Sequence, residues 1–332
     1  MDINRRVAEL IAAGERFAVG LILSTEGSTP REAGGKAVLE AGGRVHGTLG
    51  GGPTEAEAQA RAVEACRAGE AEVFEVELAG ASAGDRGPIC GGRMRLLVDP
   101  TTGKDAAAYE AAAVAREERR RGALVTAVMT DGEGRVRTAT CWVAEGAEVA
   151  APEAGPGTEV ITEEIAPAPL LLIAGGGHIG QALAAQATLV GFDVTVLDDR
   201  PEFTAPALFP EGVRTRCCDV AGELAAQELS SDAYVVIVTR GHQHDAAALR
   251  VCLGQPVAYI GMIGSRRKVA LMREEFLARG WANEGEFDRV YAPIGLDIGA
   301  ETVPEIAASI VGQLIAVRRT GTAARMPRAA DR

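Results

Sequence analysis

The second half of the chain alternates short apolar runs with segments of helical periodicity. The apolar runs predict β-strands over residues 170–174, 193–197, 213–217, 234–239, 257–261 and 289–291. The segment after the first run carries Ile179, Leu183 and Val190 at helical spacing, and helical patterns also follow the other runs. Apolar strands joined by helices are typical of a parallel, doubly wound sheet that is covered on both faces. We therefore predict a C-terminal Rossmann-like domain over residues 169–320.

The first half of the chain has a less regular pattern. Its periodicity predicts helices over residues 4–13 and from the segment "TLGGGPTE" through Cys66, with strands at 17–24, 36–39, 44–47, 72–77, 93–98 and 123–130. This mixture indicates an N-terminal mixed α/β domain over residues 1–145. Residues 146–168 are rich in Pro, Gly, Ala and Glu, which predicts a linker, and residues 321–332 are predicted to be a flexible tail.

Composition excludes several classes of protein. The 332 residues are enough for two domains, and 47% apolar and 24% charged residues are ordinary for a globular protein. The net charge of -12 and the aromatic content of 4% argue against nucleic acid or an anionic membrane as a partner. The N-terminal segment lacks the apolar core of a signal peptide, and no apolar run reaches the roughly 20 residues of a membrane span. We therefore expect a cytoplasmic location.

The segment "LLLIAGGGHIG" (170–180) runs from a predicted strand through a glycine-rich turn into a predicted helix. Gly175, Gly177 and Gly180 have the spacing of a dinucleotide-binding fingerprint, which serves the turn, the approach of a phosphate and close helix packing. Asp198 or Asp199, about 20 residues further on, is placed to bind a ribose hydroxyl. This pattern permits NAD(P) as a cofactor, and the alternative is a scaffold whose glycines serve only packing.

The loops after the predicted strands hold three of the four histidines. If the strand order is 3-2-1-4-5-6, the first and fourth strands are neighbours, and His178, His242 and His244 face each other across one cleft beside Asp245. Such a group favours a ligand-binding or catalytic role. A catalytic metal site is the weaker option, and for any one of these histidines alone the alternative is a surface or helix-capping role.

The segment "SRRK" places Ser265, Arg266, Arg267 and Lys268 at the start of a predicted helix, where the helix dipole disfavours cations. An anionic ligand such as a phosphate resolves this conflict, because the helix N-terminus and the basic side chains then share it. The alternative is a solvated basic face. Asp297 lies in a further polar loop, "APIGLDIGAE", on the same predicted edge, and we include it among the candidate ligand-binding residues.

The first half of the chain contains two further glycine loops. One is "GTLGGGPTE", with Gly50, Gly51, Gly52 and Glu55, and the other is "GSTPREAGGK". Loops of this kind are suited to hold a ligand through their backbone N–H groups.

The six cysteines are scattered along the chain without a CxxC pair, which argues against a zinc knuckle or a disulfide framework. Most of them are predicted to be small buried residues. Cys90 differs, because Gly91 and a second glycine follow it and leave the thiol accessible as a metal or sulfur ligand. The alternative is a buried cysteine in a turn.

These motifs resemble the xanthine dehydrogenase accessory factor family, of the XdhC/CoxI type, over nearly the whole chain. The segments "GSTPREAGGK", "GTLGGGPTE" and "CGG" are similar to its N-terminal domain. The segments "GGGHIG", "DDRPEF", "GHQHD", "YIGMIGSRRK" and "APIGLDIGAETVPEIAASIVGQLIAVR" are similar to its Rossmann-like domain. Some relatives carry a cysteine in the first glycine loop, where this chain has Pro53, and this leaves Cys90 as the main sulfur candidate.

The resemblance implies an accessory chaperone rather than a catalyst. Such a protein is expected to bind the molybdenum cofactor (molybdopterin or its dinucleotide form), to assist its sulfuration with a cysteine desulfurase, and to insert it into an apo molybdenum hydroxylase of the xanthine dehydrogenase type. The glycines, histidines, aspartates and arginines named above then bind the cofactor, with Cys90 near the molybdenum, and we expect a homodimer. The alternatives are an NAD(P)-dependent oxidoreductase that uses the "GGGHIG" fingerprint, and a ligand sensor without chemistry.

Overall fold

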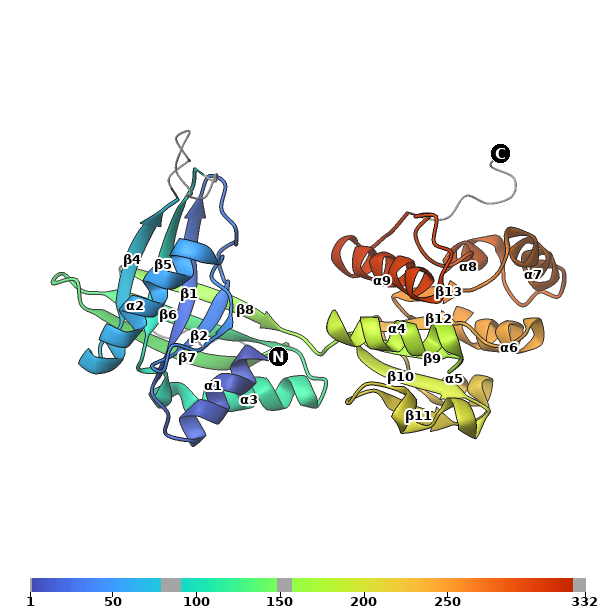
Figure 1. Ribbon diagram of the computed structural model, residues 1–332, viewed down its shortest axis with the longest axis horizontal. Helices are drawn as coiled ribbons and strands as arrows, with labels where there is room; N and C mark the ends of the chain where they lie inside the picture. Colours follow the sequence, from blue (N-terminus) through green and yellow to red (C-terminus); the bar gives the residue numbers. More distant parts are fainter. Residues whose placement is uncertain (1, 79–90, 148–156, 325–332) are drawn as a thin grey trace. The chain divides into compact units, whose positions relative to one another are not determined.

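The computed structural model of the protein describes residues 2–78, 91–147 and 157–324. The chain divides into two compact units, Met1–Pro167 and Ala168–Arg332 (Figure 1). The boundary between them lies at the C-terminal end of the predicted linker. Within the described ranges, no helix is both long and apolar enough to cross a membrane.

The N-terminal unit contains two antiparallel sheets. The larger sheet has the strand order β3 (Val45–Gly47), β2 (Lys36–Glu40), β1 (Phe17–Glu26), β5 (Arg93–Asp99) and β4 (Glu72–Glu77). The smaller sheet has the order β7 (Val136–Ala144), β6 (Gly122–Thr130) and β8 (Thr158–Ile165). The helices of the unit are α1 (Ile3–Ala12), α2 (Gly52–Ala68) and α3 (Ala106–Glu117), and the short 3-10 helix η1 (Thr102–Asp105) precedes α3.

The side chains of the central strand β1 are buried on both sides of the larger sheet. This explains why its sequence is nearly continuously apolar. On one face Ala18 and Ile22 pack in a cluster with α2. On the other face Val19 packs in a cluster with α1 and α3, and Leu21 packs in a cluster with Val128 of the smaller sheet. The larger sheet is therefore a middle layer with a core on each side.

Part of the predicted linker is a strand. Residues 158–165 form β8, which pairs with β6 in antiparallel register. The alternation of β8 is hidden in the sequence, because Glu159 and Glu163 occupy positions that face the larger sheet, where they pair with Arg95 and Lys36. The predicted linker was therefore too long. Residues 148–156 of it, and residues 325–332 of the predicted tail, lie outside the described residues.

The C-terminal unit has the predicted doubly wound, Rossmann-like architecture. Its six parallel strands follow the predicted 3-2-1-4-5-6 order, which is β11 (Arg214–Cys217), β10 (Asp193–Asp198), β9 (Leu170–Ala174), β12 (Ala233–Ile237), β13 (Tyr259–Met262) and β14 (Val290–Tyr291). One face is covered by α4 (His178–Leu189) and α9 (Val303–Thr320). The other face is covered by α5 (Val220–Ala226), α6 (His242–Leu253), α7 (Arg266–Ala278) and α8 (Glu284–Asp288). The 3-10 helices η2 (Pro201–Phe203) and η3 (Pro206–Leu208) follow β10.

Alternate residues of each central strand serve the two faces. In β9, Leu171 and Ile173 pack in the cluster with α4 and α9, whereas Leu172 and Ala174 pack in the cluster with α6 and α7. Because all six strands are parallel, their carboxyl ends lie at one edge of the sheet. The loops that carry the candidate residues leave the sheet there, and we call this edge the carboxyl edge.

Candidate functional site

The glycine loop after β9 has one position that is open to a ligand. Gly175 has a φ of +123°, and a Cβ there would lie 2.4 Å from the carbonyl oxygen of Val238. A Cβ on Gly180 would lie 2.0 Å from the carbonyl oxygen of Gly175, so this glycine permits α4 to pack closely on the loop. A Cβ on Gly177 would meet no atom within 4 Å. Gly177 is therefore the position at which a ligand has room to approach the backbone.

Asp198 stabilises this loop from the end of β10. Its buried carboxylate accepts hydrogen bonds from the backbone N–H of Gly176 (2.8 Å) and from Nε of Arg200 (2.9 Å). Burial raises the pKa of this carboxyl, but the hydrogen bonds outweigh burial and hold the pKa below its usual value. The guanidinium of Arg200 also lies over the ring of Phe203, 3.8 Å from its centroid. Asp199 also accepts a hydrogen bond, from Arg240 (2.7 Å), but it is exposed whereas Asp198 is buried, so Asp199 is the better placed of the two for a ribose hydroxyl.

The three histidines of the carboxyl edge lie on different surfaces. His178 is the exposed first residue of α4, whereas α6, which carries the other two, covers the opposite face of the sheet. Residues two apart on a helix point in different directions. Accordingly, Nε2 of His242 lies 3.4 Å from a carboxylate oxygen of Glu275 on α7, and His244 lines a pocket near β11. The structure therefore does not bring them into the one cleft that we predicted.

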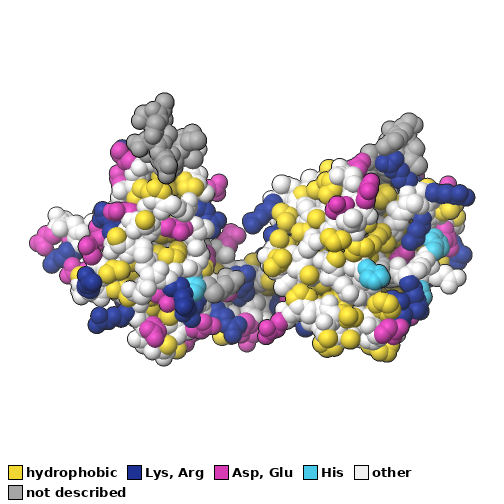
Figure 2. All heavy atoms as spheres, in the orientation of Figure 1, with side chains coloured by type: hydrophobic (Ala, Val, Ile, Leu, Met, Phe, Trp, Pro, Cys, Tyr) yellow, Lys and Arg dark blue, Asp and Glu magenta, His cyan; other side chains and the backbone are white. Residues whose placement is uncertain are grey.

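Figure 2 shows the histidines of this unit as separate spots on the surface. In the part of the chain that the structure describes, no group of three or more His, Cys, Asp and Glu side chains is placed to hold a metal ion. The weaker metal option thus gains no support from these residues.

The pocket that His244 lines lies at the ends of β10 and β11 and has a volume of about 420 Å³. It combines polar and apolar side chains from β11, α5, α6 and two loops, namely Asp199, Cys217, Cys218, Asp219, Val220, Ala221, His244 and Ala247. Burial raises the pKa of the Cys218 thiol, which keeps this sulfur protonated. Sequence reasoning missed the pocket, although two adjacent cysteines directly at the end of a predicted strand were a signal for it.

Asp245 and Lys268 form an ion pair between α6 and α7. Asp245 is fully buried, and its carboxylate accepts hydrogen bonds from the hydroxyl of Thr239 (2.6 Å) and from the ammonium of Lys268. Lys268 also donates to the backbone carbonyl of Ile263 (3.3 Å). The predicted ligand-binding residue Asp245 is thus enclosed by protein, and Lys268 is not free to bind an anion.

Arg266 and Arg267 remain available for an anion. The hydroxyl oxygen of Ser265 accepts a hydrogen bond from the backbone N–H of Lys268 (3.3 Å), so Ser265 caps α7 and fixes where the helix begins. Neither arginine has a side-chain partner among the described residues, and Arg267 is exposed. Two unpaired guanidinium groups beside a helix N-terminus favour an anionic ligand.

The loop that carries Asp297 is fixed by the buried side chain of Gln313. The amide oxygen of Gln313 accepts hydrogen bonds from the backbone N–H of Gly295 (2.9 Å) and from the hydroxyl of Tyr259 (2.6 Å). Its amide nitrogen donates to the carbonyl oxygen of Gly295 (3.1 Å). Asp297 itself is exposed. Sequence reasoning missed Gln313, although a glutamine inside the apolar stripe of a helix is a signal for such a role.

The glycine loops of the N-terminal unit meet at one end of the larger sheet. A Cβ on Gly27 would lie 3.0 Å from the carbonyl oxygen of Gly91, and a Cβ on Gly50 would lie 2.6 Å from the ring of Pro30. Segments that are far apart in the sequence therefore converge at this end. Gly91 is exposed there, whereas Cys90 lies outside the described residues.

Glu55 shapes its glycine loop from the first turn of α2. One of its carboxylate oxygens accepts hydrogen bonds from the backbone N–H groups of Leu49 and Gly51, both at 3.1 Å, and from the hydroxyl of Thr48. Gly51 and Gly52 have positive φ angles, and a Cβ on either would meet no atom within 4 Å. These two glycines are the open positions of the loop, and the Glu55 carboxylate is engaged by the protein.

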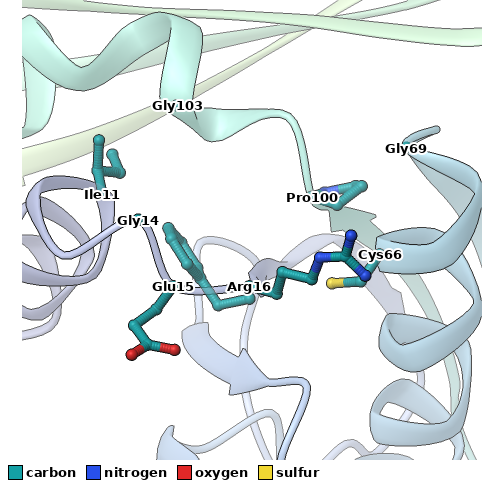
Figure 3. Close-up of a pocket in the computed structure, with 9 residues that line it drawn as sticks. Ile11, Gly14, Glu15, Arg16, Cys66, Gly69, Pro100 and Gly103 are labelled. Atoms are coloured by element: carbon teal, nitrogen blue, oxygen red, sulfur yellow. The ribbon is translucent and has the colours of Figure 1, made fainter.

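A pocket with a thiol lies at the opposite end of the larger sheet. It has a volume of about 250 Å³ and lies among the end of α1, the end of α2 and the loop after β5 (Figure 3). Figure 3 shows the guanidinium of Arg16 beside the sulfur of Cys66. Burial raises the pKa of the Cys66 thiol, although the charge of Arg16 opposes this. Cys66 is therefore a weak nucleophile, and the predicted motif residues do not line this pocket.

Two family models match the chain. The model described as the XdhC Rossmann domain matches residues 171–314, and the model described as the XdhC and CoxI family matches residues 10–77. Together they cover more than half of the chain, one in each unit. The chain belongs to the XdhC and CoxI family of xanthine dehydrogenase accessory factors, which confirms the resemblance seen in its motifs.

Three curated bacterial proteins are similar to this chain. The uncharacterized protein YqeB of Escherichia coli K12 is 27% identical over 96% of this chain and 46% of its own length. A probable xanthine dehydrogenase subunit of Bacillus subtilis 168 is 32% identical over 49% of this chain and 47% of its own length. The molybdenum cofactor insertion chaperone PaoD of Escherichia coli K12 is 24% identical over 95% of this chain and 88% of its own length. The chain thus spans about half the length of the first two relatives.

A solved structure supports the fold of the whole chain. The crystal structure described as a xanthine dehydrogenase from Bacillus halodurans has a TM-score of 0.78 to this chain, with 23% identity, and the match covers 98% of each chain. At this identity, the likeness speaks for the fold alone.

Proposed function

We propose that this protein binds the molybdenum cofactor and delivers it to a molybdenum hydroxylase of the xanthine dehydrogenase type. Membership in the XdhC and CoxI family and similarity to the chaperone PaoD over 95% of this chain support this function. The observation that carries the proposal is that Arg266 and Arg267, which have no side-chain partner among the described residues, lie at the same edge as the open backbone of Gly177.

The carboxyl edge suits the phosphate end of this cofactor. Helices α4 and α7 both begin at this edge, and the backbone N–H groups at a helix N-terminus favour an anion. Arg266 and Arg267 supply charge-assisted hydrogen bonds to phosphate oxygens. When bound, the cofactor supplies the molybdenum centre that the client hydroxylase needs. The residues of this chain hold its phosphate and orient it for transfer.

A finer part of the proposal concerns sulfur. We propose that the cofactor is sulfurated while it is bound, with a cysteine desulfurase as the sulfur source, and that the Cys90 thiol acts near the metal. The support is that Gly91, the next residue, is exposed where the glycine loops of the N-terminal unit meet. Cys90→Ala is expected to impair activation of an apo-hydroxylase while the melting temperature and the cofactor affinity stay unchanged. Normal activation with a lower melting temperature would make Cys90 structural.

We also propose that the protein is a homodimer, because a carrier of dimeric hydroxylases that has two linked domains would be able to place its clefts between subunits. Light scattering measures this directly at micromolar concentration. A mass of one chain would exclude the dimer and leave the cofactor-binding proposal intact.

A second candidate function rests on Gly177 and Asp199. An open glycine after the first strand and an exposed aspartate after the second are also the features that bind NAD(P) in an oxidoreductase. This candidate predicts a nicotinamide dinucleotide at the carboxyl edge.

Mass spectrometry of co-purified ligand separates the two candidates. The full chain is purified from a host that makes the molybdenum cofactor, beside the variant R266A/R267A from the same host. We expect a pterin phosphate or its dinucleotide form with the unmodified chain and much less of it with the variant. NAD(P) in its place would favour the oxidoreductase, and the same amount of pterin with the variant would contradict the proposed site.

A further inference from the structure

Strand β8 ends the smaller sheet of the N-terminal unit with an unpaired edge. It is eight residues long, and it pairs with β6 on one side in a register without a shift from Thr158 to Ile165. On its other side it has no neighbouring strand within the described ranges. The backbone N–H and C=O groups of this edge are therefore available to a further strand.

The other edge strands of the described sheets are short or in contact with each other. Strands β3, β11 and β14 have three, four and two residues. Strands β4 and β7 meet through the isolated bridge between Ala71, which directly precedes β4, and Val136 of β7. Natural proteins protect sheet edges with short strands, prolines, lysines or bulges, and β8 has none of these.

The side chains of β8 alternate between the two faces of its sheet. Glu159 and Glu163 pair with cations of the larger sheet, and Ile161 packs against a cluster that contains Leu21 of that sheet. The outward positions are Thr158, Val160, Thr162 and Glu164. Of these, Val160 is a large apolar side chain that is 42% exposed. Valine and threonine suit paired strands, so the outward face favours contact with another strand.

We propose that β8 pairs with β8 of a second copy of this chain, in antiparallel orientation about a two-fold axis. This inference rests on the proposed homodimer and deepens it, because it names the interface. Two identical antiparallel strands are self-complementary, so their pairing closes a dimer and leaves neither β8 edge open. The smaller sheets of the two copies then form one continuous sheet.

The outward side chains indicate the register of this pairing. Residues directly opposite each other in an antiparallel pair lie on the same face of the sheet, so the axis passes through a residue. An axis at Ile161 sets this residue opposite its own copy and Val160 opposite Thr162. It also sets Thr158 opposite Glu164. These pairs join apolar, β-branched and hydroxyl side chains, and none of them sets two like charges against each other.

The inward side chains agree with an axis at Ile161. Glu159 then lies opposite Glu163, but Arg95 and Lys36 of the same chain already pair with these carboxylates. An axis one residue further along β8 would instead set Ile161 opposite Glu163, which places an apolar side chain against a charged one. The axis at Ile161 therefore gives the better match on both faces.

Lysines at the outward positions should separate the two copies. V160K/T162K sets lysines opposite each other on both sides of the axis, so it should raise the dissociation constant of the dimer at least about tenfold. L189K/T320K is the matched control, because Leu189 and Thr320 are exposed in the C-terminal unit. Sedimentation equilibrium of the full chain measures the dissociation constants, with melting temperatures as a check on folding. An unchanged constant in V160K/T162K, or an equal increase in the control, would overturn the interface.

Cysteines at the same positions test the register. In a mixture of V160C chains and T162C chains, the two new thiols lie opposite each other, at a Cβ separation of about 4.5–5.5 Å. Mild oxidation should therefore link one chain of each kind. Each variant alone should form no more linked dimer than the unmodified chain, which measures the background from the other cysteines. No additional linkage in the mixture, or linkage of T162C chains alone, would overturn the axis at Ile161.

The oligomeric state of the unmodified chain decides first. A mass of one chain at micromolar concentration would overturn this inference together with the proposed homodimer. A dimer that V160K/T162K leaves intact would overturn the β8 interface alone. Neither result concerns Arg266 and Arg267, so failure of this inference is distinguishable from failure of the proposed cofactor binding, which the R266A/R267A variant tests.

Discussion

The two units use their glycine-rich motifs differently. In the C-terminal unit, the loop leaves a parallel sheet and ends at Gly177, whose backbone is open at the start of α4. In the N-terminal unit, the loops meet at the end of an antiparallel sheet, and Glu55 occupies two backbone N–H groups that a ligand would otherwise use. The comparison teaches that most motif residues shape a loop, and that only a few are left to face a ligand.

Charged residues follow the same division. The carboxylate of Asp198 is engaged by Arg200, and that of Asp245 by Lys268. These two cations are therefore paired as well. In the N-terminal unit the ammonium of Lys36 is likewise paired with a carboxylate. Arg266 and Arg267 have no such partner among the described residues. The proposed site therefore rests on charges that have no partner in the described part of the chain, and not on the motif as a whole.

The largest effect is expected where a motif residue is buried. Asp245→Ala removes the carboxylate that pairs with Lys268, and loss of one partner of a buried pair costs about 3–5 kcal/mol in free energy of unfolding. Asp199→Ala breaks the exposed pair with Arg240 and should cost less than about 1 kcal/mol. Urea denaturation measures both variants, and equal losses would contradict the distinction between structural and ligand-facing residues.

A smaller effect should separate two glycines of one loop. Gly180→Ala places a Cβ 2.0 Å from the carbonyl oxygen of Gly175, and this overpacking should cost about 1–3 kcal/mol. Gly177→Ala has open space around its Cβ, so it should cost less than about 1 kcal/mol, as a change at a helix N-cap. Melting temperatures compare the two variants, and a larger loss in Gly177→Ala would show that its role is structural.

In the N-terminal unit, Glu55→Ala should cost about 1–2 kcal/mol, because two backbone N–H groups and the Thr48 hydroxyl lose their acceptor. Glu64→Ala is the control, since Glu64 is exposed on the same helix. Thermal unfolding should show a clear loss in the first variant and almost none in the second. Equal stability of both would mean that the Glu55 carboxylate is available to a ligand.

The smallest effect concerns pH, and its sign should differ between the units. The folded state lowers the pKa of Asp198, so this residue contributes stability above its unfolded pKa and loses it as pH falls through the folded pKa. Burial raises the pKa of Asp105, against the charge of Lys104, so this residue costs stability as pH rises above its unfolded pKa.

Two amide variants make this difference measurable. At pH 7, Asp105→Asn should therefore stabilise the protein by up to about 1 kcal/mol, whereas Asp198→Asn should destabilise it. Melting temperatures across pH 3–8 measure both (a range chosen to span roughly the carboxyl pKa values). A less stable Asp105→Asn at pH 7 would contradict this account of Asp105.

The fold of the C-terminal unit was predictable from the sequence, and that of the N-terminal unit only in part. Each central strand of the parallel sheet is buried on both faces, so its sequence is an apolar run. Helix α3, by contrast, consists mostly of alanine and was missed, and so was strand β7. In β8, Glu159 and Glu163 form ion pairs with the larger sheet in place of apolar contacts, which hides the strand from any pattern of hydrophobic residues.

The candidate site was predictable as an edge of the sheet but not as a set of contacts. Topology alone places the loops after parallel strands at one edge, so their sequence positions were enough. The pairing of Asp199 with Arg240, 41 residues away, depends on how the loops pack. In the same way, the rotation of α6 about its own axis determines which residues its histidines meet. His242 lies beside Glu275, and His244 lies beside the end of β11. No local spacing in the sequence contains that information.

The most direct test of the central claim is the affinity of the full chain for isolated molybdenum cofactor, measured by titration at moderate salt. R266A/R267A should bind at least about tenfold more weakly, because each charge-assisted hydrogen bond is worth about 1.5–3 kcal/mol. R44A/R319A removes the same charge from exposed arginines outside the proposed site and should bind like the unmodified chain. Unchanged affinity in R266A/R267A, or an equal loss in both variants, would contradict the claim that the carboxyl edge holds the phosphate of the cofactor.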